Sequence, residues 1–149
     1  MRLKTSLKLT QKPFLSLFHL IGIAGPIGTQ DEPLLASANK MRPGNMLVRN
    51  RYMIGLTPRW GGSYDKMKEF IARSKKDGAS AVGIMQLEAI MYDDMGLTAS
   101  EHGDKPATVQ NLSKALALSE KIGGVFRKEF LMTANDYSCR EPELKKYCK

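Results

Sequence analysis

The chain has 149 residues, of which 42% are hydrophobic and 26% are charged. This composition excludes a disordered or low-complexity chain, and the length fits one globular domain of ordinary size. The formal net charge is +8. Half of that charge comes from four residues that precede the first acidic one: Arg2, Lys4, Lys8 and Lys12. The remaining bias is mild and no nucleic-acid-binding motif accompanies it, so nucleic acid is not an expected partner.

Residues 1–30 are interpreted as a basic and apolar N-terminal extension. The basic residues are followed by a mostly apolar run, 14–25, which is too short for a spanning helix of about 20 residues. The order of the two parts is similar to a secretory signal, although small residues suited to cleavage follow only at 36–38, after Asp31 and Glu32. A signal, a membrane anchor and a buried helix stay open, and a cytoplasmic location is slightly favoured over a periplasmic or secreted one.

Residues 31–149 are expected to form a single α-helical domain of about five to six helices. Start and stop signals and apolar residues at helical spacing place the helices at 31–41, 46–56, 63–78, 80–91, 106–122 and 125–134. The apolar helix that begins at Ser80 is expected to be the central one, and 96–105 to be a polar loop. No stretch alternates with period two, so the fold class is all-α.

Two of these helices carry apolar and small residues at the same spacing. The two sets are Tyr64, Met67, Ile71 and Ser74, and Leu112, Ala115, Ser119 and Ile122. The first set follows a helix and a glycine-bearing turn, as in the second helix of a tetratricopeptide repeat. The copies lie 48 residues apart, whereas a regular repeat has about 34. We therefore predict tetratricopeptide-like helical hairpins with an irregular repeat.

The most informative stretch is 57–64, which we call the corner: Thr57, Pro58, Arg59, Trp60, Gly61, Gly62, Ser63 and Tyr64. The proline disfavours helix just before it, and the two glycines permit backbone angles that suit a reversal. Ser63 is placed to cap the next helix. We expect Trp60 to plug the space between the two helices and Arg59 to orient carbonyls or stack on a ring. Arg59 to Tyr64 are also the candidate interaction residues.

Residues 49–64, with Met67 and Phe70 after them, resemble a bacterial domain-of-unknown-function family. That family has a Pro-Arg-Trp-Gly-Gly-Ser signature beside tetratricopeptide-like helices. The terminal segment 139–148 is similar to the ends of some members, so the resemblance covers about 36–149. It implies a helical fold and carries no established activity.

The sequence offers no convincing catalytic or metal-binding set. His102 lies beside Glu101 and Asp104 in a segment expected to be solvated surface. Asp93 and Asp94 are adjacent, and adjacent side chains on a helix point about 100° apart. They are therefore not expected to act on one substrate atom. No phosphate-binding loop, nucleophile elbow or metal-spaced histidine pair is present, so we expect no enzyme, cofactor or metal.

Cys139 and Cys148 are the two cysteines of the chain. In an oxidising compartment they can form a disulfide that pins the C-terminal segment, and in the cytosol they would remain thiols. The expected function is a non-enzymatic helical-repeat module that binds a protein or peptide. The alternatives are an exported or envelope-associated protein stapled by this disulfide, with residues 1–30 as its address or membrane anchor, and a toxin-immunity or inhibitor protein.

Overall fold

The computed structural model describes residues 31–41 and 44–148, and this part of the chain contains helices and no strand. The all-α prediction is therefore confirmed. The elements are α2 (Asp31–Met41), α3 (Met46–Gly55), the 3₁₀ turn η1 (Pro58–Trp60), α4 (Tyr64–Lys76), α5 (Ala81–Glu101), α6 (Lys105–Ile122), α7 (Gly124–Phe130), α8 (Met132–Ser138) and the 3₁₀ helix η2 (Pro142–Tyr147). The expectations for residues 1–30 lie outside the described residues.

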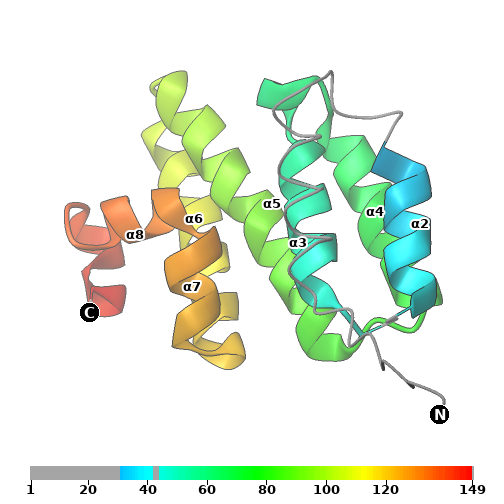
Figure 1. The fold of residues 1–149 in the computed structure, drawn as a ribbon. Helices are drawn as coiled ribbons and strands as arrows, with labels where there is room; N and C mark the ends of the chain where they lie inside the picture. The colour runs from blue at the N-terminus through cyan, green and yellow to red at the C-terminus, as the bar shows by residue number, and fades with distance from the viewer. Residues whose placement is uncertain (1–30, 42–43, 149) are drawn as a thin grey trace, which may run out of the picture.

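The long helix α5 is the centre of the molecule, as predicted. It packs along α6 and also contacts α3, α4 and α8. In Figure 1, α2, α3 and α4 lie on one side of α5, while α6, α7 and α8 lie on the other. None of the helices in the described ranges is both long and apolar enough to cross a membrane. The tetratricopeptide-like character of the packing stays a prediction.

Polar side chains cap the helices where the sequence indicated a start. The side chains of Asn45, Ser63 and Ser80 each accept a hydrogen bond from a backbone N–H in the first turn of α3, α4 and α5, at 3.2, 3.2 and 3.0 Å. Such caps satisfy donors that have no partner inside the helix. The predicted bounds of α2 and the N-terminal ends of these three helices are confirmed.

The core contains the apolar residues that the helical spacing selected. Fully buried members are Met53, Met67, Leu87, Leu112, Leu116 and Leu131. Tyr52 and Phe70 add a tilted ring pair with centroids 4.8 Å apart. A buried arginine was not anticipated: Arg49 has no exposed surface, donates to Ser74 Oγ at 3.2 Å and lies 3.8 Å from Asp77. A buried guanidinium needs such partners because burial without them is costly.

The predicted polar loop at 96–105 is wrong, because α5 continues to Glu101 and turns only at 102–104. The polar residues of this segment find partners elsewhere in the fold: Thr98 pairs with Tyr64 and Ser100 pairs with Tyr137. Gly96 is a packing position, since a Cβ there would lie 2.3 Å from Leu112 Cδ2. Polarity in this segment therefore marks contacts between helices.

The predicted last helix, 125–134, is two helices that meet at Leu131. The backbone of Leu131 leaves the helical region, with φ −113° and ψ 66°. The carboxylate of Asp93 then accepts hydrogen bonds from Ala134 N at 2.7 Å and from Thr133 N at 3.4 Å. A side chain of α5 thus replaces the carbonyls that a continuous helix would have supplied. This break gives seven α-helices in the described residues, where five to six were expected.

Candidate functional site

The corner forms a tight reversal between α3 and α4. Backbone hydrogen bonds join Trp60 N and Gly62 N to Thr57 O, at 3.0 and 3.1 Å, and Gly61 N to Pro58 O at 3.0 Å. Gly61 has φ +83°, a conformation that favours glycine. Gly62 has no positive φ and is needed for a different reason. A Cβ on it would lie 1.9 Å from Leu56 O, so the two backbone segments are in direct contact.

Trp60 does not plug the space between the helices, and that prediction is wrong. Its side chain is 52% exposed. Because Gly62 packs directly against Leu56, no room for an indole remains beneath the turn. Between α3 and α4, the ring of Tyr52 packs against the ring of Phe70, with the ring centroids 4.8 Å apart. The corner therefore presents its tryptophan at the surface.

Arg59 is held by a carboxylate of α5. Its Nη2 and Nε lie 3.0 and 3.2 Å from Asp94 Oδ1. Tyr64 Oη is 3.0 Å from Asp94 Oδ2 and 2.7 Å from Thr98 Oγ1. Burial raises the pKa of Asp94, while Tyr64 and Arg59 oppose that shift, and burial raises the pKa of Tyr64 to about 12. Two residues of the corner, Arg59 and Tyr64, are thus tied to one side chain of α5. The expectations that Arg59 orients carbonyls or stacks on a ring have no counterpart in these contacts.

Asp93 points to a different element from Asp94, as the angle between adjacent helical residues predicts. It accepts its hydrogen bonds from the start of α8 and is 8% exposed. Burial raises the pKa of Asp93 to about 6, although hydrogen bonds from Ala134 and Thr133 oppose the shift. Both carboxylates are thus engaged by the protein itself, and they link the corner and α8 to α5.

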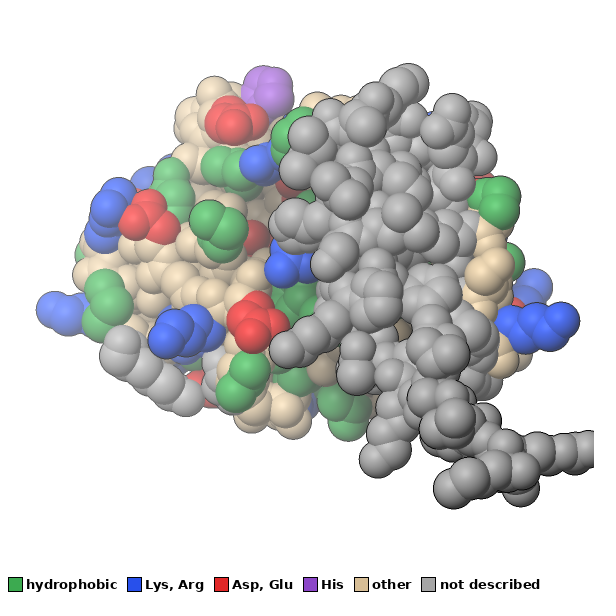
Figure 2. Space-filling view, in the orientation of Figure 1, with side chains coloured by type: hydrophobic (Ala, Val, Ile, Leu, Met, Phe, Trp, Pro, Cys, Tyr) green, Lys and Arg blue, Asp and Glu red, His purple; other side chains and the backbone are tan. Residues whose placement is uncertain are grey.

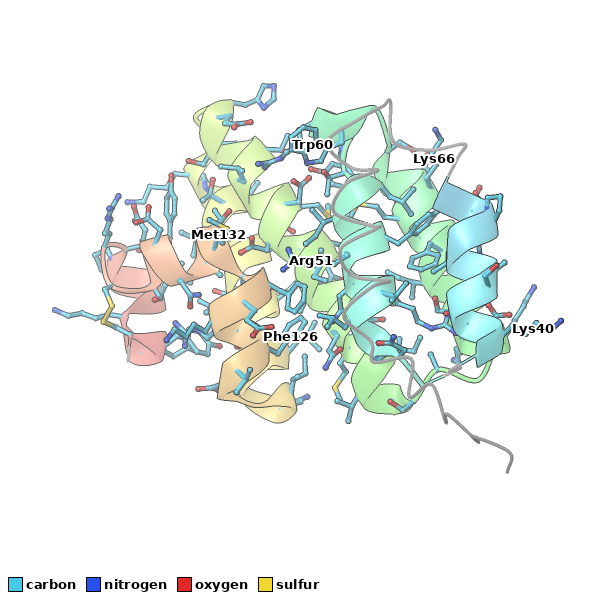
Figure 3. The ribbon with its side chains drawn as sticks, in the orientation of Figure 1. Lys40, Arg51, Trp60, Lys66, Phe126 and Met132 are labelled. Carbon is cyan, nitrogen blue, oxygen red and sulfur yellow. A yellow bond between two sulfur atoms is a disulfide. The ribbon has the colours of Figure 1, made fainter. Side chains whose placement is uncertain are left out.

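A groove runs between α3 and α7, with α5 as its floor. It consists of one cavity of about 400 Å³ and another of about 280 Å³, which share Glu129 and Phe130. The first is lined by Met46, Leu47, Asn50, Gln86, Ile122, Gly123, Val125 and Phe126, and the second by Arg51, Ile54, Thr57, Arg59, Trp60, Ile90, Asp93, Asp94, Met132 and Thr133. Figure 3 shows Trp60, Met132, Arg51 and Phe126 along it.

The groove collects exposed apolar side chains. The described residues include four large hydrophobic side chains that are exposed: Trp60 at 52%, Val82 at 44%, Val125 at 74% and Met132 at 77%. Val125 lines one cavity, and Trp60 and Met132 line the other. Val82 lines neither cavity. In the coloured part of Figure 2, hydrophobic, basic and acidic side chains are mixed.

Two charged residues in the groove have no ion-pair partner among the described residues. Arg51 lies over the ring of Phe130, with its guanidinium carbon 5.2 Å from the ring centroid, and its buried Nε has no hydrogen-bond partner. Glu129 is exposed and lines both cavities. Sequence reasoning missed both residues. Neither residue carries a local sequence signal, because charged side chains on a helix are ordinarily exposed to solvent.

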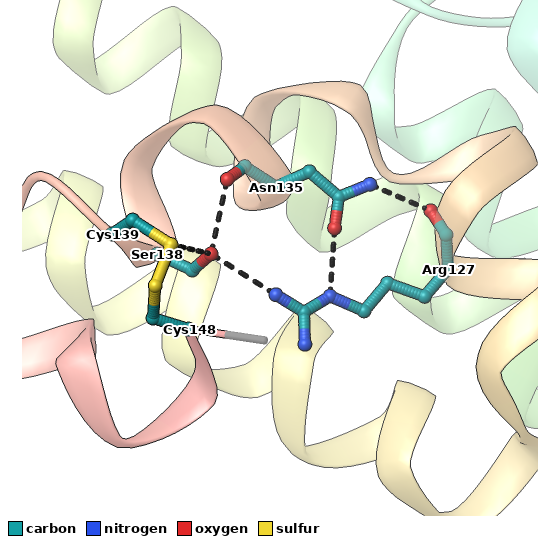
Figure 4. Close-up of a disulfide and its surroundings, with 5 residues drawn as sticks. All are labelled: Arg127, Asn135, Ser138, Cys139 and Cys148. Atoms are coloured by element: carbon teal, nitrogen blue, oxygen red, sulfur yellow. Dashed lines mark hydrogen bonds between the residues drawn. A yellow bond between two sulfur atoms is a disulfide. The ribbon is translucent and has the colours of Figure 1, made fainter.

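The C-terminal end is closed by the Cys139–Cys148 disulfide. Figure 4 shows the neighbouring network, in which Arg127 donates to Asn135 Oδ1 at 2.7 Å and to Ser138 Oγ at 3.0 Å. The disulfide joins α8 to the end of η2. It thereby holds two buried residues of η2, Leu144 and Tyr147, against the core.

The other candidate residues of the sequence do not assemble into a site. His102 follows α5, and its Nδ1 lies 2.7 Å from Thr98 O. Asp104 caps α6 by accepting from Ala107 N at 3.0 Å. Within 31–41 and 44–148, no three histidine, cysteine or carboxylate side chains gather as a metal site would require.

Residues 32–91 match the model of a family described as a domain of unknown function (DUF4034). The matched range contains α2, α3, the corner and α4 together with the first half of α5. The broad form of the resemblance is thereby supported, while the signature motif and the bacterial origin stay predictions. Neither a curated protein nor a solved structure matches the chain.

Proposed function

We propose that the protein is a non-enzymatic helical module that binds another protein or a peptide, and that it does so in the groove between α3 and α7. One observation carries this proposal: three of the four exposed large hydrophobic side chains in the described residues line this groove. Exposed apolar residues gathered at a concave surface are typical of protein-binding sites.

The chemistry of these side chains fits a recognition surface. Tryptophan and arginine are enriched among the residues that dominate binding energy, and Trp60 and Arg51 line the same cavity. Trp60 is carried by a turn whose neighbours Arg59 and Tyr64 are tied to Asp94. An anchor held in this way loses little conformational freedom on binding. Met132 adds a flexible side chain that can adapt to a partner.

The test compares two exposed valines. Val125→Asp places a charge in the groove, and Val82→Asp places the same charge on an exposed site outside it. Partners are captured from the source cells with the wild-type protein, purified, and titrated by calorimetry. A partner of the groove should lose roughly tenfold or more in affinity with Val125→Asp, because a charge replaces an apolar contact, and little with Val82→Asp. Equal affinity for all three proteins would contradict the proposal.

A second candidate function is favoured by the disulfide. Disulfides persist in oxidising compartments and are rare in the cytosol, so the Cys139–Cys148 bond fits an exported or envelope-associated protein. Fractionation of cells, with thiol labelling under non-reducing conditions, tests this candidate. A cytosolic protein with two labelled cysteines would exclude it.

A further inference from the structure

We propose that a cavity beside α8 binds a small organic monocarboxylate through the guanidinium of Arg127. The cavity has a volume of about 390 Å³ and lies between the end of α6, the short helix α7 and α8. This volume is within the range of about 300–1,000 Å³ that is usual for small-molecule sites. Of its described lining residues, only Gly123 also lines the groove. The site is therefore separate from the groove and does not depend on the proposed function.

The guanidinium of Arg127 is held in place by side chains of α8. Its Nε donates to Asn135 Oδ1 at 2.7 Å, and its Nη2 donates to Ser138 Oγ at 3.0 Å. Both acceptors are fixed in turn, because Asn135 Nδ2 donates to Arg127 O at 3.0 Å and Ser138 Oγ donates to Asn135 O at 3.0 Å. The guanidinium is thus ordered before a ligand arrives, which lowers the entropy lost on binding.

One nitrogen of this guanidinium is left over. Arg127 Nη1 is buried and has no hydrogen-bond partner, and no carboxylate of the described residues forms an ion pair with the side chain. In Figure 4, dashed lines reach two nitrogens of Arg127, and the third points away from Asn135 and Ser138. A buried cationic donor is costly unless it is paired. The donor is therefore available to an acceptor from outside the chain.

The charges around the cavity favour a ligand with a single negative charge. Lys128 and Glu120 are exposed and line the cavity, and neither has an ion-pair partner in the part of the chain that the structure describes. With Arg127 they make two cations and one anion, so a carboxylate balances the site, whereas a phosphate dianion adds a surplus charge beside Glu120. A carboxylate also matches the planar fork of a guanidinium, which can donate to both of its oxygens.

The exposed side chains set the route to the buried nitrogen. An entering carboxylate passes Lys128, which attracts it, and Glu120, which repels it. Both are long surface side chains that can rotate aside. Because Nη1 is withdrawn from water, a hydrogen bond to it is electrostatically stronger than one at the surface. Arg127 should therefore dominate the affinity, while Lys128 and Glu120 adjust it.

The first test uses sodium acetate as the probe and acetamide as its uncharged isostere. Both are titrated into the isotope-labelled full chain at constant ionic strength, and the backbone amide resonances of residues 119–139 are followed. Acetate should give a saturable shift with a dissociation constant of about 1 mM, a reasonable value for so small a ligand, and acetamide should give none. No saturation with acetate, an equal response to acetamide, or tighter binding of inorganic phosphate would overturn the proposal.

A substitution at Arg127 tests whether this side chain carries the binding. Arg127→Lys keeps the positive charge but removes the fork, so acetate should bind roughly tenfold more weakly. Arg140→Lys is the matched control, because Arg140 pairs with Asp136 at 2.8 Å and does not line the cavity. The control should bind acetate as the wild type does. An unchanged dissociation constant in Arg127→Lys would overturn the proposal.

Two further variants leave the hydrogen bonds of Arg127 intact, so they do not depend on how Arg127→Lys folds. Glu120 and Lys128 are exposed, and their replacement should not disturb the circular dichroism spectrum. Glu120→Gln should tighten acetate binding by roughly two- to fivefold, and Lys128→Gln should weaken it by a similar factor. Equal affinities in these two variants would place acetate away from the cavity and would refute the assignment.

Discussion

The close contact between Gly62 and Leu56 makes the corner unusually sensitive to a single methyl group. In Gly62→Ala, the new Cβ would lie 1.9 Å from Leu56 O, 2.3 Å from its carbonyl carbon and 2.8 Å from its Cα. All three are backbone atoms at the end of α3, and Leu56 N is itself hydrogen-bonded to Tyr52 O and Met53 O. The clash cannot be relieved by rotating a side chain. The corner has to move.

Gly61 provides the matched control, because it is adjacent to Gly62 but its substitution meets an unfavourable backbone angle and no steric clash. A Cβ at Gly61 would contact nothing within 4 Å, but its φ of +83° is unfavourable for alanine. Gly61→Ala should therefore cost only the conformational penalty of about 1–2 kcal/mol. Gly62→Ala should lower the free energy of unfolding by about 3–5 kcal/mol. The new methyl group overpacks the turn, and the shift of the turn also displaces Arg59 from Asp94.

Urea unfolding of the two variants and the wild type measures both free energies. Circular dichroism should report the whole fold and fluorescence of Trp60 should report the corner. Equal losses for the two glycines, or a Gly62→Ala loss below about 1 kcal/mol, would show that the contact with Leu56 is not tight and would refute the reasoning.

Three further predictions follow from the described contacts. Trp60→Ala should lower the free energy of unfolding by only about 1–2 kcal/mol, because about half of the ring is exposed; a urea-unfolding loss near that of a fully buried tryptophan, about 3–5 kcal/mol, would contradict the exposed position. Cys139→Ser should cost about 2–3 kcal/mol, as expected for opening a loop of about ten residues; with reductant present, the variant and the wild type should unfold at the same urea concentration. Asp93→Asn should remove part of the pH dependence of stability. The folded protein binds the Asp93 proton with a pKa of about 6 and the unfolded chain with a pKa of about 4. The free energy of unfolding of the wild type should therefore fall by up to about 3 kcal/mol as pH rises from 4 to 7. Urea unfolding measured at several pH values should show a smaller fall in the variant.

Local signals predicted the first helices well. The bounds of α2 follow from Asp31, Glu32 and Pro33 at its start and the Pro43–Asn45 break after it. The cap at Ser63 and the turn at Gly61 were also read correctly from neighbouring residues. Each of these features depends on hydrogen bonds that span only a few positions, so the necessary information lies in a short window of sequence.

The features that were missed depend on contacts between distant residues. Arg59 meets Asp94 across 35 positions, and Asp93 meets Ala134 across 41. The first contact fixes the corner and the second starts α8 where an unbroken helix was expected. The exposure of Trp60 was missed for a different reason: apolar character predicts burial, but here the backbone of Gly62 packs directly against Leu56. The groove depends on the Arg59–Asp94 and Asp93–Ala134 contacts, so no short window of the sequence predicts it.

The two adjacent carboxylates of α5 explain why the groove has a defined shape. Asp94 holds Arg59 and Tyr64 on the corner side, while Asp93 holds the start of α8, which carries Met132. The two exposed hydrophobic side chains of the smaller cavity, Trp60 and Met132, are therefore positioned by neighbouring residues of one helix. The family match ends at residue 91, just before this pair. The matched range thus contains the corner but not the side chains that fix it, and the groove is a property of the α-helical unit that extends beyond the match.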